Sequence, residues 1–254
     1  MEGDSGIPSV IALIPARSGS KRVQQKNVRV LGDHPVIAYT IAAAQESGIF
    51  AKVLVSTDSE EYAAIARHYG ADVPFLRPPE VSGDLSPDIE WVDFTLNKLR
   101  EQGSKFGCFS ILRPTSPFRQ AATIRRAWNQ FLSDEAVDSL RAVEKCKQHP
   151  GKMWVVRQNR MTPLLPLTPA EIPWHSRQYQ SLPEIFVQNA SLEIAWSRVV
   201  FESRSISGTV LMPFFTEGYE GFDINDPIDW QRAQDLVESG DAHLPHVFQS
   251  RYPA

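Results

Sequence analysis

Short apolar runs alternate with amphipathic stretches over roughly the first 140 residues of the chain. Each apolar run is a few residues long and is followed by proline, glycine or polar residues, which is typical of strands buried in a sheet. These runs predict strands at residues 9–16, 52–58, 72–78, 108–112 and 137–143. Stretches with helical periodicity lie between them and predict helices at residues 35–48, 59–70, 89–102 and 121–132. The alternation predicts an α/β fold, an open and mostly parallel sheet with helices on both faces.

The pattern weakens after residue 145 and returns near residue 185. Residues 145–182 are rich in proline, glutamine and arginine, and "LPLTPAEIP" is not expected to form a regular element. Beyond this segment, the pattern predicts two more strands and a closing helix, at residues 192–196, 209–215 and 226–240. We therefore predict one domain over residues 9–240 that carries a small insert at 145–182, with loose termini at 1–8 and 241–254.

The composition is that of an ordinary globular protein, but its charge makes some functions improbable. The 254 residues carry a net charge of −4 with a pI near 5.9, which argues against a general nucleic-acid binder. No apolar run approaches the roughly 18 residues of a membrane span. The start, "MEGDSGIPS", lacks the basic and apolar regions of a signal peptide, and the cysteines and histidines lack zinc-binding spacing. We expect a cytoplasmic protein with no nucleic-acid or membrane partner.

Positive charge is concentrated in the loop after the first predicted strand, which contains "LIPARSGSKR". Residues 17–29 include five cations and no acid. Ligands of open α/β sheets bind beyond the carboxyl ends of the strands, where this loop should lie. Small residues let the backbone approach an anion, and arginine and lysine add charge-assisted hydrogen bonds. A polyphosphate is therefore the expected ligand, and a solvated basic loop is the alternative.

The loop matches none of the Walker, G-x-G-x-x-G or G-x-S-x-G motifs. Instead, "IALIPARSGSKRVQQKN" resembles the nucleotide-binding loop of the CMP-sialic acid synthetases, also called acylneuraminate cytidylyltransferases. The segments "VSTDSEEYAAIARHYGADVPFLRP", "ILRPTSPFR", "VQNASLEIA" and "FDINDPIDW" follow in the order found in that family. The resemblance covers roughly residues 10–237, nearly the whole chain.

This resemblance implies a single α/β nucleotidyltransferase domain with a dimerisation insert. It also implies transfer of CMP from CTP to the anomeric hydroxyl of an acidic 2-keto sugar, with release of pyrophosphate and with Mg²⁺ as cofactor. The expected partners are CTP, the acid sugar and a second copy of the chain.

The resemblance also implies roles for residues at the nucleotide. Arg17 and Lys26 match cations that hold the triphosphate, and Arg77 matches the residue that reads the cytosine edge, for which a planar fork of donors is suited. Asp88 lies where the family closes a loop over the base, but it could equally cap the following helix. The expected nucleotide-binding residues are Ala16, Arg17, Ser18, Gly19, Ser20, Lys21, Lys26, Asn27, Arg77, Ser86 and Asp88.

Two positions in the expected acceptor site depart from the family pattern. Arg113 stands where many members have glutamine, and Val187 stands where some members have arginine. We interpret this exchange of cations as a change in sugar specificity, with Arg177 as the main partner of the acceptor carboxylate. Arg119 could belong to the site or be a structural charge beside a helix. The expected acceptor-binding residues are Arg113, Thr115, Ser116, Lys152, Arg177, Gln188 and Asn189.

Asp223 resembles the catalytic metal-binding aspartate of the family. Many relatives have a second aspartate where this chain has Asn225. Residues two apart on a strand share a face, so Asn225 would also face the metal, with a neutral oxygen. One or two carboxylates suffice for Mg²⁺, which also takes water and phosphate oxygens. We expect Asp223, Arg17 and Lys26 to be catalytic, Asp223 and Asn225 to bind metal, and Asp226 to cap a helix.

Two other readings of the sequence remain open. The same chemistry could act on legionaminic acid, pseudaminic acid or the eight-carbon Kdo. Alternatively, Asn225 and Val187 could mark a nucleotide-binding relative with impaired catalysis. A glycosyltransferase would usually need an acidic D-x-D motif after a middle strand, and the sequence has none there.

Overall fold

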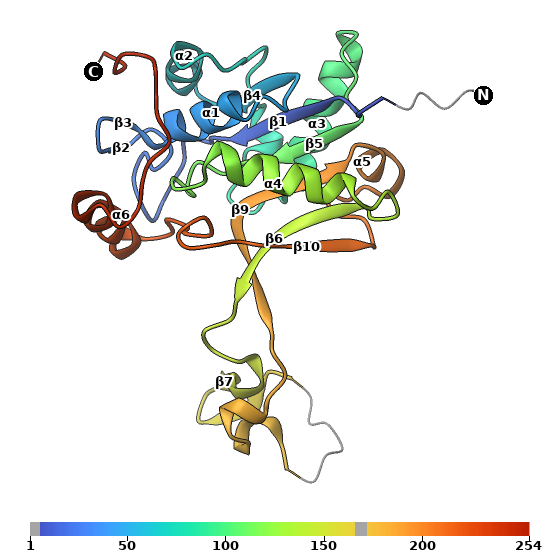
Figure 1. Cartoon of the computed structure of the whole chain (residues 1–254), viewed down its shortest axis with the longest axis vertical. Helices are drawn as coiled ribbons and strands as arrows, with labels where there is room; N and C mark the ends of the chain where they lie inside the picture. Colours follow the sequence, from blue (N-terminus) through green and yellow to red (C-terminus); the bar gives the residue numbers. More distant parts are fainter. Residues whose placement is uncertain (1–5, 166–171, 254) are drawn as a thin grey trace. The chain divides into compact units, whose positions relative to one another are not determined.

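A six-stranded sheet lies at the centre of the part of the chain that the structure describes (Figure 1). The structure, a computed structural model, describes residues 6–165 and 172–253. The strand order is β10-β6-β9-β5-β1-β4, where the strands are β1 (Val10–Pro15), β4 (Lys52–Ser56), β5 (Cys108–Ile111), β6 (Ser139–Lys145), β9 (Phe186–Trp196) and β10 (Leu211–Phe215). β1 pairs in parallel with β4 and β5, whereas β9 is antiparallel to β5. The loops that follow β4, β1 and β5 therefore meet at one edge of the sheet.

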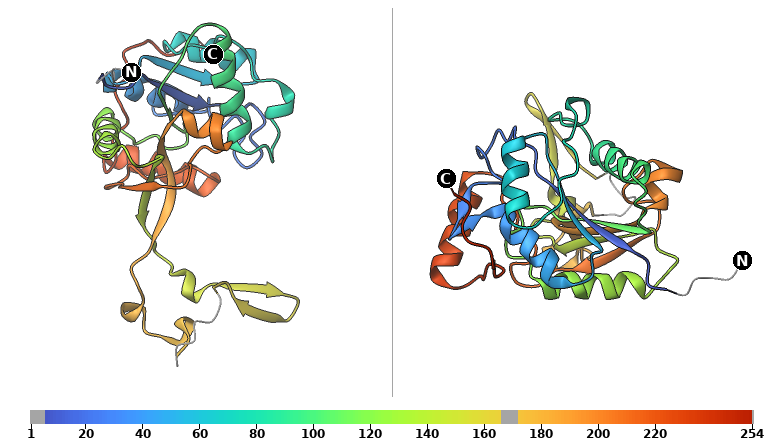
Figure 2. Two further views of the ribbon diagram at one scale, coloured as in Figure 1. Left: turned by 90° about the vertical axis from the view of Figure 1, so that its right-hand side faces the viewer. Right: turned by 90° about the horizontal axis from the view of Figure 1, so that it is seen from above.

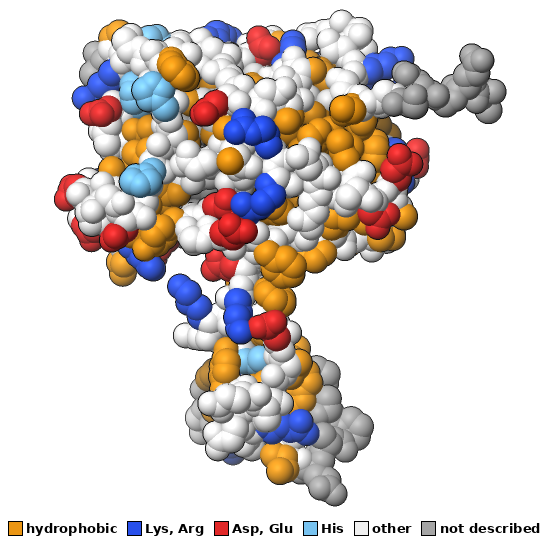
Figure 3. Space-filling model, in the orientation of Figure 1, with side chains coloured by type: hydrophobic (Ala, Val, Ile, Leu, Met, Phe, Trp, Pro, Cys, Tyr) orange, Lys and Arg blue, Asp and Glu red, His pale blue; other side chains and the backbone are white. Residues whose placement is uncertain are grey.

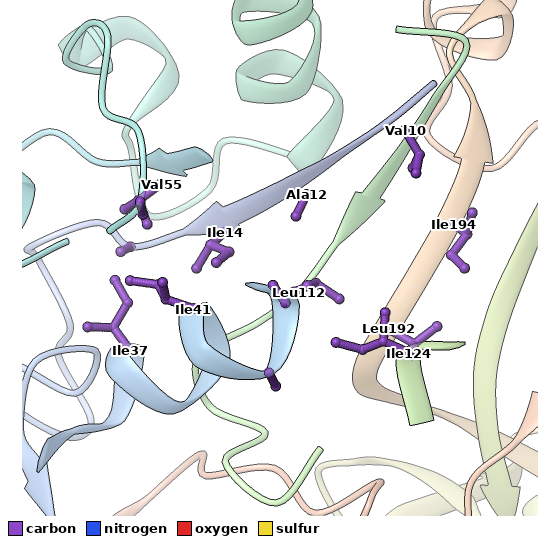
Figure 4. Close-up of a cluster of buried hydrophobic side chains, with 14 of the residues drawn as sticks. Val10, Ala12, Ile14, Ile37, Ile41, Val55, Leu112, Ile124, Leu192 and Ile194 are labelled. Carbon is purple, nitrogen blue, oxygen red and sulfur yellow. The ribbon is translucent and has the colours of Figure 1, made fainter. Parts of the chain in front are cut away.

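Helices cover both faces of the sheet, which confirms the predicted fold class (Figure 2). Alternate residues of β1 supply the two cores, because successive side chains of a strand point to opposite faces. Ala12 and Ile14 pack in the same cluster as Ile41 (Figure 4), whereas Ile11 and Leu13 pack in the other. The first cluster includes α1 (Val36–Ser47), α2 (Glu60–His68) and α4 (Ala121–Leu132), and the second includes α3 (Asp88–Glu101) and α5 (Arg198–Ser203).

Three helix ends lie where their capping residues predict. α1 ends at Gly48, whose φ of 69° is the left-handed conformation that glycine adopts without strain. The hydroxyl of Ser59 accepts a hydrogen bond from the backbone N–H of Tyr62 at the start of α2. Asp226 forms a capping box with Asp229 at the start of α6 (Pro227–Ser239), so its predicted capping role is confirmed.

The strand predicted at residues 72–78 is wrong. Only an isolated bridge between Leu54 and Asp72 forms there, before the short helix η1 (Pro79–Val81). The prolines of this segment have no N–H to donate to a strand ladder, which explains the difference. Two further elements carry no clear periodic signal, the small ribbon of β2 (Val30–Leu31) with β3 (His34–Pro35) and the six-residue helix α5.

The chain divides into two compact units, and the second unit spans Val143–Gln188. Its elements are the antiparallel hairpin of β7 (Trp154–Arg157) with β8 (Arg160–Pro163) and the short helices η2 (Pro150–Lys152), η3 (Trp174–Ser176) and η4 (Tyr179–Ser181). The predicted insert at 145–182 falls within these bounds. Residues 166–171, which hold most of the proline-rich stretch, lie outside the described residues.

The C-terminal segment packs against the main unit, so the prediction of a loose tail is wrong for residues 241–253. Leu244 and Val247 pack with α6 in a third hydrophobic cluster. The ring of His68 forms a hydrogen bond with the carbonyl of Ser250, and the hydroxyl of Tyr69 accepts one from the backbone N–H of Tyr252. At the other end, Ile7 is exposed, while residues 1–5 and 254 of the predicted loose termini lie outside the described residues.

None of the described helices has both the length and the apolar character needed to cross a bilayer. The longest, α3, has 14 residues and carries charges in its first and last turns.

Candidate active site

A cavity of about 390 Å³ lies at the carboxyl ends of β1 and β5 in the main unit. It brings together eleven of the predicted site residues from five separate stretches of the chain: Arg17, Ser20, Lys26, Asn27, Arg77, Ser86, Asp88, Arg113, Thr115, Asp223 and Asn225. Residues that the sequence analysis did not select also line it: Pro15, Val81, Gly83, Asp84, Trp91, Pro114 and Ala190. The loops gather here because parallel strands end at the same edge of the sheet.

Hydrogen bonds that involve Asp58, Asn27 and Ser56 fix the shape of the phosphate-loop candidate, residues 16–27. The backbone N–H and hydroxyl of Ser18 both donate to Asp58, which follows β4. The amide of Asn27 donates to the carbonyl of Arg17, and Ala16 is fully buried with its N–H bonded to the carbonyl of Ser56. These contacts fix the backbone that presents the cations. Ala16, Ser18 and Gly19 do not themselves line the cavity.

The cations of this loop differ in their surroundings. Lys26 is half-buried and donates to the carbonyl of Ile224 at 2.8 Å. Burial lowers the pKa of Lys26, and nearby Asp223 partly opposes that effect. Arg17 and Lys21 both form ion pairs with Asp84. With Arg22, these residues line a second cavity of about 290 Å³ that shares residues with the first.

Arg77 is buried and rigidly held beside the cavity. Its Nε donates to the hydroxyl of Ser56 at 3.1 Å and its Nη2 to the carbonyl of the same residue at 3.0 Å. The guanidinium lies over the Trp91 ring, 4.8 Å from the ring centroid. Burial lowers the pKa of Arg77 to about 10, so the group stays protonated at neutral pH. The result is a planar cation of fixed orientation, suited to recognise a planar polar ligand.

Arg113 belongs to a row of alternating charges formed by Asp88, Arg113, Glu193 and Arg141. The two carboxylates largely offset the positive charge that the sequence analysis expects Arg113 to add to the acceptor site. Its Nη2 contacts Asp88 at 2.5 Å and Glu193 at 3.0 Å, and Glu193 also pairs with Arg141. Glu193 is 4% exposed, and its pairing with two arginines explains how a carboxylate is tolerated there. The signal that could have revealed this network is a single charge inside each of two apolar strands, in "LEIAW" and "SLRAV".

Asp88 does not cap α3, because the capping residue is Pro87 and Asp88 is the first residue of the helix. Its carboxylate instead accepts hydrogen bonds from the Trp91 indole and from Arg113. Burial alone would raise the pKa of Asp88, but Arg113 and the indole outweigh it, and the pKa is lowered. Asp88 therefore stays ionised and links Trp91, on whose ring Arg77 stacks, to Arg113.

The segment after β5 contributes one residue to the cavity and buries others. Thr115 lines it, whereas Ser116 is buried outside it. Arg119 is fully buried, donates to Thr40 and to the carbonyl of Ser191, and so is a structural residue that joins this segment to β9. Burial lowers its pKa to about 9.

The remaining predicted acceptor residues lie outside this cavity. Asn189 donates through its amide to Thr216 at 2.8 Å. Lys152, Arg177 and Gln188 belong to the second unit. There, Lys152 donates to the carbonyl of Arg177 at 2.8 Å, and Arg177 lines a separate cavity of about 520 Å³.

Asp223 and Asn225 lie side by side at the cavity, with the amide of Asn225 donating to Oδ2 of Asp223 at 2.7 Å. The other carboxylate oxygen, Oδ1, is buried and has no hydrogen-bond partner among the described residues. A buried carboxylate oxygen without a hydrogen-bond partner fits a Mg²⁺ ion, which takes hard oxygen ligands. Among the described residues, no group of three or more acidic, histidine or cysteine side chains is placed to hold a metal ion, so most ligands of such an ion would come from water and substrate.

The sequence of the chain is similar to those of known proteins. The sequence profile of the family described as Cytidylyltransferase matches residues 11–161. The CMP-N,N'-diacetyllegionaminic acid synthase of Legionella pneumophila is 33% identical over 235 residues, which cover 90% of this chain and 96% of that protein. The N-acylneuraminate cytidylyltransferase of Escherichia coli is 30% identical over 248 residues, 95% of this chain but 55% of that protein.

A solved structure extends the agreement to the fold. The CMP:2-keto-3-deoxy-manno-octonic acid synthetase complexed with CTP superposes with a TM-score of 0.66, over 91% of this chain and 99% of that one, at 12% identity. The profile match and the identity to the Legionella protein confirm the family that the sequence motifs suggested. The chain belongs to the cytidylyltransferase family.

Proposed function

We propose that this protein transfers CMP from CTP to the anomeric hydroxyl of an acidic 2-keto sugar and releases pyrophosphate. The observation that carries the proposal is that Arg17, Lys26, Arg77 and Asp223 line one cavity at the sheet edge where α/β proteins bind nucleotides. The cations suit a triphosphate, the fixed guanidinium of Arg77 suits a base edge, and the carboxylate suits the metal that accompanies CTP.

In the proposed reaction, the sugar oxygen forms a bond to the α-phosphorus of CTP while the bond from that phosphorus to the β-phosphate oxygen breaks. The hydroxyl proton passes to solvent and the pyrophosphate leaves. Arg17 and Lys26 stabilise the charge that develops on the leaving group, because preorganised cations in a cavity need little rearrangement during the reaction. Mg²⁺, held by Asp223 and Asn225, would supply further neutralisation of phosphate charge.

We propose a nonulosonic acid, meaning a sialic-acid-like sugar, as the acceptor. The named relatives act on N,N'-diacetyllegionaminic acid and on N-acylneuraminate, which supports this class. Arg113 and Thr115 would contact the acceptor in the main cavity. Lys152, Arg177, Gln188 and Asn189 stay predicted acceptor residues, with Arg177 as the partner of the sugar carboxylate.

We also propose a homodimer that uses the second unit. Apolar side chains lie at the surface of this unit (Figure 3), and the exposed ones include Trp154, Val155, Val156, Met161, Leu164, Leu165, Ile172, Tyr179, Phe186 and Val187. A two-stranded hairpin is marginally stable alone, and all four residues of β7 are exposed. A second copy of the chain could bury this surface.

A cytoplasmic location also stays a prediction, which cell fractionation would test.

The deciding experiment is a pyrophosphate-release assay with Mg²⁺, in which CTP, UTP, GTP and ATP are each tested against a panel of nonulosonic acids and Kdo. We expect release with CTP and at least one acid sugar, and rates at least tenfold lower with the other nucleotides. Equal rates with ATP or GTP would contradict the proposal. Binding of CTP without release for any acceptor would favour the alternative of a catalytically impaired relative.

A further inference from the structure

Asp84 forms ion pairs with two cations of the phosphate-loop candidate. One carboxylate oxygen contacts Nη1 of Arg17 and the other contacts Nζ of Lys21. Asp84 lies in the loop of residues 82–87, far from Arg17 in the sequence. We call this double ion pair the Asp84 bridge.

The bridge lies between the two adjoining cavities. The cavity of about 390 Å³, which holds Arg77 and Asp223, and that of about 290 Å³, which holds Lys21 and Arg22, are both lined by Arg17, Ser20, Lys26, Asp84 and Asn225. Under the proposed function, a nucleoside triphosphate with its base near Arg77 would extend its phosphates toward these cations. Asp84 contacts the same cationic atoms of Arg17 and Lys21 that a phosphate oxygen bound there would contact.

We propose that Asp84 acts as an internal anion that competes with the triphosphate, and with the pyrophosphate product, for Arg17 and Lys21. This inference rests on the proposed function, because it takes these cations to be phosphate ligands. Two anions repel each other at one cation pair, so binding of polyphosphate requires the Asp84 bridge to open. The bridge thereby weakens polyphosphate binding and favours release of pyrophosphate.

The tip of the loop that carries Asp84 buries little surface. Leu85, next to Asp84, is 96% exposed, so displacement of the loop tip exposes no additional core. The side chain of Lys21 is 80% exposed and that of Asp84 is 35% exposed, which makes the bridge a solvent-screened contact. Lys21 and Arg17 hold the pKa of Asp84 down at about 2, so the competing carboxylate is ionised throughout the usual assay range.

The test compares wild type with Asp84→Asn, which keeps the shape of the side chain and removes its charge. The probe is inorganic pyrophosphate, titrated calorimetrically into the full chain without metal. We expect Asp84→Asn to bind pyrophosphate roughly three- to tenfold more tightly, as removal of two exposed ion pairs allows. The difference should shrink at 1 M salt, where exposed charges are screened.

Two further variants keep this test specific. Glu80→Gln removes the same charge from an exposed residue a few positions earlier, for which no ion pair is found among the described residues. It should leave pyrophosphate affinity within twofold of wild type. Asp84→Glu keeps the carboxylate and should stay close to wild type, which separates loss of charge from loss of structure.

In steady-state assays with CTP, Asp84→Asn should lower the inhibition constant of pyrophosphate by the same factor. Unchanged or weaker pyrophosphate binding by a folded Asp84→Asn protein would overturn the inference. The proposed function would still hold in that case if the wild-type protein releases pyrophosphate from CTP in the presence of an acid sugar. A wild-type protein that binds neither CTP nor pyrophosphate would instead overturn the proposed function, and the inference with it.

Discussion

The amide of Asn225 donates a hydrogen bond to Oδ2 of Asp223 at 2.7 Å, while Oδ1 of the same carboxylate is buried without a partner. The neighbouring amide thus orients the carboxylate and leaves one oxygen available to a cation. In the proposed metal site, Asp223 would supply the charge, and Asn225 would supply orientation and a neutral oxygen.

Asp223→Asn should abolish turnover while the protein stays folded and still binds CTP weakly. The substitution removes the main protein charge from the proposed metal site, which should cost several kcal/mol of transition-state stabilisation and about a thousandfold in rate. Pyrophosphate release, CTP calorimetry and circular dichroism measure the three properties. Near-wild-type release by a folded variant would show that Asp223 is structural.

Asn225→Asp is the companion to that variant. It replaces a hydrogen-bond donor by a second carboxylate beside Asp223, and the two charges repel each other unless a cation lies between them. We therefore expect the Mg²⁺ concentration for half-maximal activity to fall. An unchanged Mg²⁺ dependence would indicate that residue 225 does not face the metal.

Arg113→Gln should change the KM for the acceptor sugar more than the KM for CTP. Arg113 lies at the cavity between Asp88 and Glu193, and its loss also leaves Asp88 without its cation. Hydrogen bonds to charged groups contribute about 1.5–3 kcal/mol, which corresponds to roughly ten- to a hundredfold in affinity. Arg113→Lys, which keeps the charge, serves as control. Equal losses for every sugar in the panel would make Arg113 purely structural.

Arg77→Lys should weaken CTP binding by about tenfold and reduce the preference for CTP over UTP. Lysine retains the charge but loses the planar fork held by Ser56 and the stacking on Trp91. The kcat/KM ratio for the two nucleotides measures the effect, and Arg67→Lys on the surface of α2 is the matched control. A variant with an unaltered CTP-to-UTP ratio would exclude Arg77 from base recognition.

The two cysteines should react differently with alkylating agents. Cys108 is fully buried in β5, and burial raises the pKa of its thiol to about 12, whereas Cys146 is partly exposed. One equivalent of iodoacetamide should label the native protein and two should label the unfolded protein, as counted by mass spectrometry. Cys146→Ser should remove the native label. Labelling of native Cys108 would contradict the buried assignment.

The same thiol should make stability depend on alkaline pH. Because the pKa of Cys108 is higher in the folded state, its contribution to the free energy of unfolding is fully present below about pH 9 and is lost as pH rises toward 12. Denaturant titrations of wild type and Cys108→Ala at pH 8 and pH 10 should show the larger loss in wild type. Parallel losses in both proteins would assign the effect to other groups.

Val156→Asp should convert the proposed dimer to a monomer. Val156 is 67% exposed on β7, and a charge there would be costly to bury in an interface. Light scattering should give twice 28.5 kDa for wild type and about 28.5 kDa for the variant. Ile228 is an even more exposed apolar residue in the main unit, and the Ile228→Asp variant should stay dimeric. A monomeric wild-type protein would refute the proposed assembly.

Local pattern predicted most of the fold because each signal lies within a few residues. The apolar run of β1, Gly48 at the end of α1 and the Asp226 cap each act on their own element, so their effects can be read without knowledge of the rest of the chain. The basic loop was equally visible, because its charges adjoin one another and follow a strand.

Ion pairs between distant segments of the sequence could be identified only in the folded chain. Arg17 meets Asp84 across 67 positions and Arg113 meets Glu193 across 80, because the strand order β9-β5-β1-β4 brings their loops and strands together. No local periodicity encodes which acid reaches which cation. The sequence therefore indicates the family and predicts a phosphate-binding site. Only the tertiary structure decides that Asp84 pairs with Arg17 and Lys21 and that Asp88 and Glu193 offset the charge of Arg113, since these pairs depend on packing between distant segments.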